Sequence, residues 1–288
     1  MKPSHALGAY ATTTVFVLLW SSGAIFAKWG LEHSSAFAFL LLRFALALGA
    51  LLAIGIYRKR LLPDSGTRKH VAATGLLMIG SYSVCYLLAL DNGITPGVLA
   101  TLLGVQPILT LLILERRFPA SRLLGLGLAL TGLVLVVLQS LLKADFSFVG
   151  IAFALGALLC VTSGAILQKS IQQEPAQVLP QQYAISLLLC LAVAPTQPFH
   201  FEQSISFLIP LLWLGLVISV VAQLLLYRLI RAGNLVNVTS LFYLVPVVTA
   251  VMDYLFLGNL LSHLSLLGML AILLGLALVF RQPKAAQL

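Results

Sequence analysis

The sequence predicts an all-α integral membrane protein, with ten transmembrane helices in two inverted five-helix repeats. Three observations lead to this fold. Apolar residues make up 60% of the chain and charged residues 9%, and the mean hydropathy is +1.06, far from the balance of a water-soluble domain. A seven-residue motif occurs twice, as Ser22–Lys28 and Ser163–Lys169, with five identical positions. Basic residues gather in alternate loops, on one side of the expected membrane.

The two halves of the chain match along most of their length, with offsets of 139 to 143 residues. Further matching positions are Gln106–Thr110 with Val245–Thr249, Arg43 and Phe44 with Gln182 and Tyr183, and Gly125 and Gly132 with Gly268 and Gly275. The expected domains are a first repeat over 1–142, a second over 147–281 and a cytoplasmic tail over 282–288. Internal repeats of this kind usually surround a pathway near the middle of the bilayer.

Each repeat contains five apolar segments of about the length that a spanning helix requires. They cover residues 7–29, 36–57, 71–90, 97–114 and 123–142, and then 148–167, 178–194, 207–226, 235–257 and 264–280. The seventh segment has the weakest pattern, because Pro180 stands near its start and Pro195 directly follows it. The first segment is too long for a signal peptide and its motif recurs deep in the chain, so we expect it to be retained.

The loops predict the orientation, because Lys and Arg accumulate in short cytoplasmic loops. With the N-terminus inside, fourteen of the 17 basic residues lie on the inner side, Lys28 and Lys143 lie outside, and Arg43 lies within the second segment. We therefore expect a multi-pass protein of the cytoplasmic (inner) membrane with both termini in the cytoplasm. Five spans per repeat is an odd number, so the second repeat is inverted. Because the net charge of +9 comes from these loops, nucleic-acid binding is not expected.

Short motifs in the first repeat resemble a known family, the ten-helix EamA-type permeases of the drug/metabolite transporter (DMT) superfamily. Leu19–Gly23 resembles the opening of that family's first helix, and Leu42–Phe44 resembles the Leu-Arg-Phe of its second. Gln106-Pro107 looks like the proline of its fourth helix, and Glu115 stands where an acid usually closes that helix. The resemblance covers essentially the whole chain. It implies helix bundles around a central cavity, and alternating access that carries a small metabolite across the membrane, most often outward.

Polar side chains inside apolar spans normally face the bundle interior or a wet cavity, so we take them as the expected substrate pathway. They are Trp20, Ser21, Ser22, Arg43, Tyr82, Tyr86, Gln106, Gln168, Gln182, Gln223 and Tyr243. For each tyrosine the alternative is a packed ring with its hydroxyl bonded to a neighbouring carbonyl. Gln106 is favoured because Pro107 frees a carbonyl one turn earlier and can kink the helix, as Pro246 can in the second repeat.

Arg43 and Asp253 are ionisable residues expected inside the membrane, both nearer its outer side. They form a candidate coupling or gating pair, in which Arg43 holds an anionic group or an outer gate. The alternative is a structural ion pair, or an Arg43 side chain that extends to the lipid headgroups. Lys28 and Lys169, at helix ends, are expected to anchor the helices at the interface. The glycines at one-turn spacing, such as Gly125, are expected to allow close helix packing.

Enzyme motifs are not found: the eight acids are dispersed, and neither a zinc-binding spacing nor a Walker-type loop occurs. We therefore expect no enzyme, no cofactor and no metal. The function that follows is secondary export of small metabolites, such as amino acids or their analogues. The expected partners are a small-molecule substrate and the lipid bilayer, with protons as the candidate coupling ion and a homodimer as the candidate assembly. The alternatives are a polytopic ligand-binding sensor or scaffold subunit without net transport, and an intramembrane transferase, which would need a dense acidic or histidine-bearing site.

The basic-residue count predicts the outcome of reporter fusions. Fusions after Arg60, Arg117, Gln173, Arg231 and Leu288 are expected to report the cytoplasm, and fusions after Asn92, Asp145 and Gln203 the exterior. The measurement is paired activity of a cytoplasmic and an external reporter. A cytoplasmic signal at Gln203 would remove the seventh span and break the repeat.

Overall fold

The structure is a computed structural model of the chain, and it describes residues 3–138, 142, 147–257 and 262–281. The elements named in these residues are all helices. They are α1 (Pro3–Leu31), α2 (Ala36–Tyr57), α3 (Arg68–Gly75), α4 (Tyr82–Asp91), α5 (Pro96–Leu103), α6 (Gln106–Leu114), α7 (Ala120–Val136), α9 (Phe148–Ser170), α10 (Pro175–Val193), α11 (Ile205–Leu212), α12 (Gln223–Ala232), α13 (Leu235–Ser240), α14 (Leu244–Leu257) and α15 (His263–Phe280), with short helices between some of them. The expected tail over 282–288 lies outside the described residues.

Nine helices or helix series among the described residues are long and apolar enough to cross a membrane. A tenth apolar helix, α7, has 17 residues, and the expected segment over 123–142 runs beyond it into positions that the structure does not describe. The seventh segment is the helix α10, which continues through Pro180. The all-helical membrane fold expected from the sequence is confirmed.

Four spans are interrupted, and they occupy corresponding places in the two halves. The third span is α3, a π-helical segment over Leu76–Ser81 and α4, and the eighth is α11, a π-helical segment over Trp213–Ala222 and α12. The fourth span is broken between α5 and α6, and the ninth contains a 3-10 turn over Leu241–Tyr243 between α13 and α14. The breaks of the fourth and ninth spans lie just before Pro107 and Pro246. A proline lacks an N–H and crowds the carbonyl one helical turn earlier.

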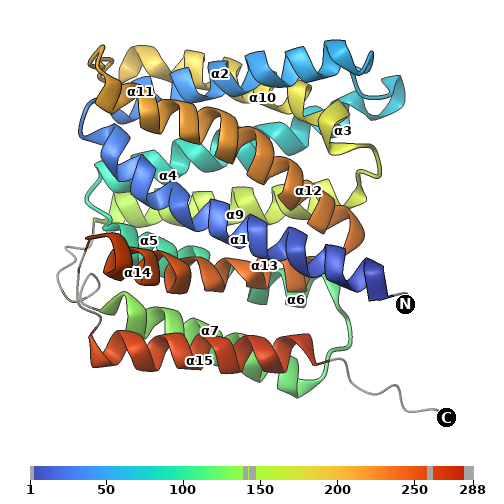
Figure 1. Cartoon of the computed structure of the whole chain (residues 1–288), viewed down its shortest axis with the longest axis vertical. Helices are drawn as coiled ribbons and strands as arrows, with labels where there is room; N and C mark the ends of the chain where they lie inside the picture. Colours follow the sequence, from blue (N-terminus) through green and yellow to red (C-terminus); the bar gives the residue numbers. More distant parts are fainter. Residues whose placement is uncertain (1–2, 139–141, 143–146, 258–261, 282–288) are drawn as a thin grey trace.

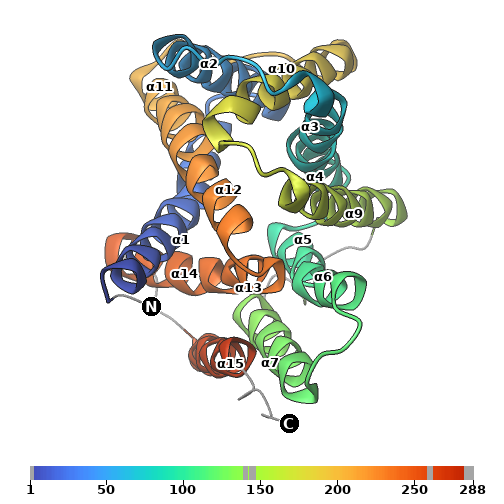
Figure 2. The same ribbon diagram turned by 90° about the vertical axis from the view of Figure 1, so that its right-hand side faces the viewer.

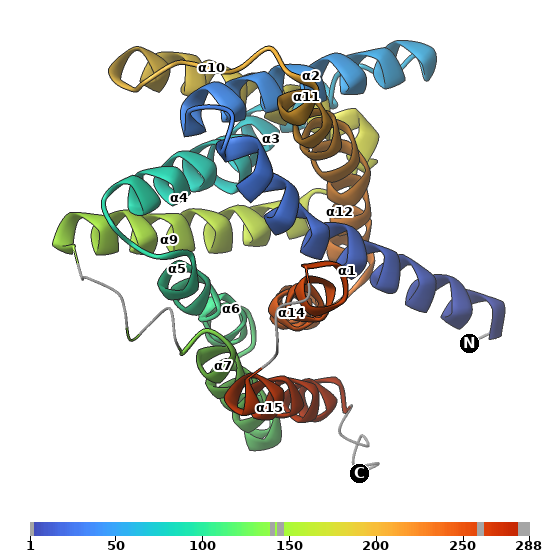
Figure 3. The same cartoon turned by 60° about the vertical axis from the view of Figure 1, so that its left-hand side comes forward.

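The spans lie side by side as a bundle, with the start of α1 and the end of α15 at the same end (Figure 1). Viewed along the helices, α7 and α15 form a separate pair beside the others (Figure 2). The helix α1 crosses obliquely over α12 and α14 (Figure 3). The largest buried apolar cluster joins α1, α2, α10 and α12 through Phe16, Phe44, Tyr183 and Tyr227, among other residues.

The pair α7 and α15 packs through glycines. A Cβ atom added at Gly125 would lie 2.7 Å from the carbonyl oxygen of Gly275, and one added at Gly132 would lie 2.5 Å from that of Gly268. Because the two contacts run in opposite order along the chain, the helices are antiparallel. Only residues without a side chain allow backbones to approach this closely. The packing role expected for these glycines is confirmed.

We expect Gly132→Ala to destabilise the protein, because its Cβ would meet backbone rather than a movable side chain. Overpacking of this kind costs about 1–3 kcal/mol. The matched control is Gly127→Ala on the same helix, since a Cβ at Gly127 would meet no atom within 4 Å. The measurement is the thermal midpoint of both variants in detergent. Equal midpoints would contradict the close contact.

Candidate functional site

Arg43 brings four spans together inside the bundle. Its Nε donates a hydrogen bond to Ser219 Oγ at 2.7 Å, in the π-helical part of the eighth span. Tyr82 of α4 and Tyr183 of α10 lie near the guanidinium, and Tyr183 also lies near Ser219. We call Arg43, Tyr82, Tyr86, Tyr183 and Ser219 the central polar cluster.

The Arg43 guanidinium is only partly used by these contacts. Its terminal nitrogens, Nη1 and Nη2, have no hydrogen-bond partner among the side chains that the structure describes. The side chain is surrounded by protein, and yet it keeps part of its surface accessible. Burying the N–H groups of a cation without hydrogen-bond partners costs free energy. These two nitrogens are therefore available to bind water or a ligand.

Aromatic rings form the wall next to Arg43. Tyr82 and Tyr86 lie one turn apart on α4 with ring centroids 5.9 Å apart, and both keep accessible surface despite the protein around them. On the other side, Phe44 and Tyr183 meet edge to face at 5.6 Å. Rings of this kind offer flat apolar surface close to the charge.

A chain of buried polar side chains lies next to the cluster. Gln182 Nε2 donates to Gln168 Oε1 at 2.9 Å, and the Tyr227 hydroxyl donates to Gln182 Oε1 at 2.7 Å. Tyr227 also interacts with Gln223. We call these four residues the glutamine–tyrosine chain. Because the amide of Gln182 is bonded at both ends and fully buried, the chain ties α9, α10 and α12 together.

Sequence reasoning named only part of this site. Tyr183 was recognised as the match of Phe44, whereas Ser219 and Tyr227 were missed. The signal was present, because Ser219, Gln223 and Tyr227 follow each other at intervals of four residues and therefore share one face of the eighth span. Only Gln223 was singled out from that polar stripe.

The pathway candidates on α1 make contacts with other helices, and the hydrogen bonds of their side chains involve residues other than Arg43. Trp20 packs its ring against Phe16 and Phe242, with centroids 5.3 and 5.5 Å away. Ser21 Oγ donates to the Val17 carbonyl within the helix, and Ser22 Oγ accepts a hydrogen bond from Trp213 Nε1 at 3.0 Å. These contacts join α1 to the eighth and ninth spans.

Gln106 and Tyr243 stand at the breaks of the fourth and ninth spans. Tyr243 is buried and its hydroxyl donates to the Gly104 carbonyl, the arrangement that is the alternative to a pathway role. Gln106 is a buried residue, and its side-chain amide has no hydrogen-bond partner among the described residues. At the break of the fourth span, the carbonyl of Gly104 is therefore bonded by Tyr243, the residue at the matching position of the second half.

The second member of the expected charged pair, Asp253, belongs to α14. The position of its side chain lies outside what the structure describes. The pairing with Arg43 therefore stays a prediction.

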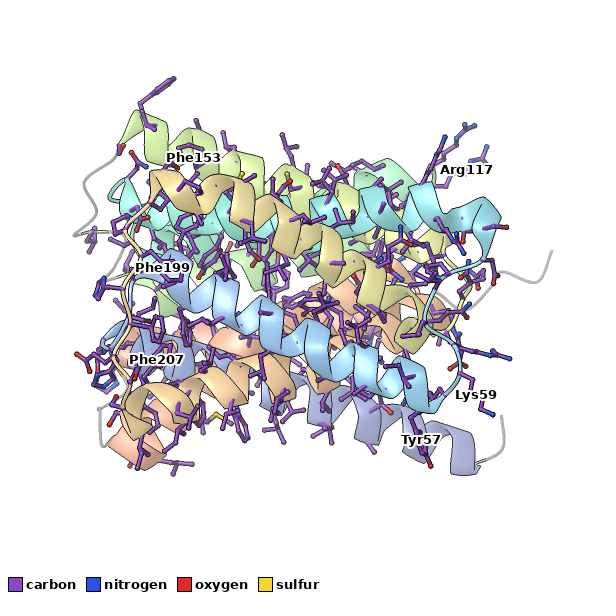
Figure 4. The ribbon with its side chains drawn as sticks, turned by 90° about the horizontal axis from the view of Figure 1, so that it is seen from above. Tyr57, Lys59, Arg117, Phe153, Phe199 and Phe207 are labelled. Atoms are coloured by element: carbon purple, nitrogen blue, oxygen red, sulfur yellow. The ribbon has the colours of Figure 1, made fainter. Side chains whose placement is uncertain are left out.

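Polar contacts also join helix ends at one end of the bundle, which carries Lys59 and Arg117 (Figure 4) and which we call the basic end. Arg122 Nη1 contacts both carboxylate oxygens of Glu115, at 2.7 and 2.6 Å, and Nη2 donates to Asn234 and Asn237. These bonds join the fourth and fifth spans to the ninth.

Lys169, near the end of α9, has a specific contact. Its Nζ donates to the carbonyls of Ile230, Arg231 and Gly233, at 2.8, 3.1 and 2.6 Å. A cation that bonds the last carbonyls of a helix satisfies groups without an intrahelical partner and complements the helix dipole. In this position Lys169 caps the end of α12, rather than serving only as the interface anchor that its place in the sequence suggested.

Comparison with known proteins agrees with the resemblance seen in the sequence. The model of the EamA-like transporter family matches residues 8–138 and 148–281. A curated relative, a probable amino-acid metabolite efflux pump of Salmonella typhimurium (strain LT2), is 25% identical over 281 residues, with 90% of each chain covered. One crystal structure of another protein has the same fold, with a TM-score of 0.79 at 18% identity over 95% of this chain and 96% of that one. The chain belongs to the EamA-like transporter family.

Proposed function

We propose that this transporter exports small metabolites, amino acids or their analogues first among them, across the cytoplasmic membrane by alternating access. The observation that carries the proposal is Arg43, whose terminal nitrogens have no hydrogen-bond partner among the side chains that the structure describes. A guanidinium with two free donors in one plane fits the carboxylate of an amino acid. The name of the Salmonella relative supports the same substrate class.

The central polar cluster supplies complementary chemistry around that charge. Ser219 holds Nε and so fixes the plane of the guanidinium, while Tyr82 and Tyr86 add apolar ring surface with hydroxyl groups. A ligand with one carboxylate and a short apolar or aromatic body would match both parts. We infer that these residues line the pathway, and that the glutamine–tyrosine chain supports it from behind.

Contacts between matching positions support an inverted arrangement of the halves. Phe44 packs on Tyr183, and the Gly104 carbonyl accepts a hydrogen bond from the Tyr243 hydroxyl. In each pair the two residues are 139 positions apart in the sequence. Two equivalent positions touch each other only near an axis that exchanges them. Because α7 and α15 are antiparallel, such an axis would lie in the plane of the membrane, as inverted repeats require.

Alternating access needs contacts that open in turn at the two ends. At the basic end, Arg122 joins Glu115 to Asn234 and Asn237. At the opposite end, His33 Nδ1 lies 2.7 Å from Glu202 Oε2, and a short bridge joins Ser34 to Phe201. We propose that these ties are inner and outer closures of the pathway, with the basic end in the cytoplasm.

Transport into sealed proteoliposomes tests the proposed function directly. We expect labelled amino acids of at least one class to accumulate, and accumulation to exceed that in protein-free vesicles. A ligand that raises the thermal midpoint of the purified protein but is not transported would indicate the sensor or scaffold alternative instead.

In the same assay, Arg43→Gln is expected to raise KM for a carboxylate substrate about tenfold or more, because a charge-assisted hydrogen bond contributes about 1.5–3 kcal/mol. Arg117→Gln is the matched control, since Arg117 is exposed at the basic end. Unchanged KM in Arg43→Gln at normal folded yield would remove Arg43 from the binding site.

The pairing of Arg43 with Asp253 is tested by a double-mutant cycle. If the two charges interact, Arg43→Gln and Asp253→Asn each leave the other charge unmatched, and the double variant recovers part of the loss in stability or transport. Additive defects would rule out the pair. Loss of gradient-driven transport with preserved exchange in Asp253→Asn would identify Asp253 as the proton-coupling acid.

A further inference from the structure

A groove at the basic end lies apart from the central polar cluster. It consists of two adjoining cavities of about 390 and 350 Å³, which share Arg58 and Ala176. The end of α2, the start of α10 and the helix α12 form its walls. We call it the basic-end groove. Among the described residues, no hydrogen bond joins this lining to the central polar cluster.

The walls of this groove change from apolar to basic at one level. On α2, Ala53 and Ile54 precede Arg58 by about one helical turn, and on α12, Leu224 precedes Arg228 by one turn. An apolar wall that ends in cations has the polarity profile of a phospholipid, with an acyl chain below a phosphate. A soluble anion would have no use for the apolar part.

Tyr57 shows where this change lies relative to the membrane. Its side chain is 89% exposed, and it stands at the basic end with Lys59 and Arg117 (Figure 4). Tyrosines at the ends of spanning helices mark the level of the headgroups, because the ring is amphipathic. The neighbouring Arg58 is therefore at the depth of the lipid phosphates.

The charge of the groove is not neutralised by the protein. The side chains of Arg58, Arg60 and Arg228 have no hydrogen bond or ion pair with any residue that the structure describes. The acid in the lining, Glu174, faces Arg231 at 4.0 Å. Basic pockets between spanning helices on the cytoplasmic side bind anionic headgroups.

We propose that the basic-end groove binds one anionic phospholipid of the cytoplasmic leaflet, with its phosphate between Arg58 and Arg228 and an acyl chain along Ala53 and Leu224. Such a lipid would join the ends of α2 and α12, the spans that carry Arg43 and Ser219. The inference uses the proposed orientation to name the leaflet, and it is independent of the transported substrate.

Thermal denaturation of the purified full-length protein in neutral detergent tests the site. We expect dioctanoyl phosphatidylglycerol to raise the midpoint in a saturable manner, and equal concentrations of dioctanoyl phosphatidylcholine or glycerol 3-phosphate to have little effect. An equal rise with phosphatidylcholine would mean that charge does not select the ligand. An equal rise with glycerol 3-phosphate would mean a soluble-anion site. Either result, or no rise at all, overturns the proposal.

Paired variants with the same loss of charge locate the binding. The double variant Arg58→Gln, Arg228→Gln is expected to weaken phosphatidylglycerol binding about tenfold or more. Each basic residue near anionic headgroups contributes favourable electrostatic binding energy, and this variant removes two. Arg116→Gln with Arg117→Gln removes two exposed charges at the same end but outside the groove, and is expected to change binding less than threefold. Equal weakening in both pairs would reduce the effect to general attraction and overturn the site.

A third variant keeps the test valid if the double arginine variant does not fold. Ala53→Trp fills the apolar wall without altering charge, and we expect it to weaken binding of phosphatidylglycerol at unchanged salt dependence. Native mass spectrometry of the unmodified protein gives an independent readout, with one phosphatidylglycerol retained in preference to phosphatidylcholine. Full binding by Ala53→Trp, or equal retention of both lipids, would contradict the proposal.

Discussion

The structure depends on one constraint: inside the hydrocarbon core, polar groups find their partners within the protein, because lipid offers none. Arg43 therefore reaches across to Ser219, Gln182 uses both ends of its amide, and Lys169 bonds the open end of α12. Each of these bonds joins different spans. Packing between helices in lipid is only weakly directional, so such cross-helix bonds define which faces meet.

Duplication explains why several of these contacts come in matching positions, and divergence explains why the site is not symmetric. Phe44 meets its counterpart Tyr183, and the glycines of α7 meet those of α15. Next to Phe44, however, the first repeat carries Arg43, while the second carries Gln182 at the matching position. Among the described side chains, one copy thus provides a charge whose terminal nitrogens have no partner, and the other an amide that bonds through both its nitrogen and its oxygen. In the proposed site, a single cation favours one ligand orientation over the orientation related to it by the two-fold axis.

The sequence was sufficient for the fold, because hydropathy, repeat spacing and small-residue stripes act locally. Even α10, weakened by Pro180, is a helix, since its neighbours bury it whatever its propensity. The site was only partly predictable. The pairing of Arg43 with Ser219 depends on which faces of the two helices meet. Ser219 lies in a π-helical segment, where side chains are rotated relative to their positions in a regular α-helix. The contact of Arg122 with Glu115, Asn234 and Asn237 required knowledge of how the loops approach.

In the proposed site, Arg43 would also link ligand binding to the packing of the bundle. Because Ser219 bonds Nε, the edge of the guanidinium that carries Nη1 and Nη2 is held in place before any ligand arrives. A carboxylate that meets this edge pairs with it in two parallel hydrogen bonds and loses little entropy on the protein side. The same ligand satisfies donors that are otherwise costly among apolar helices. In the proposed site, a bound carboxylate would thus strengthen the link between α2 and the eighth span that Arg43 and Ser219 already form. The proposed substrate contact therefore requires an arginine, because a lysine offers a point charge without the planar edge that pairs with a carboxylate.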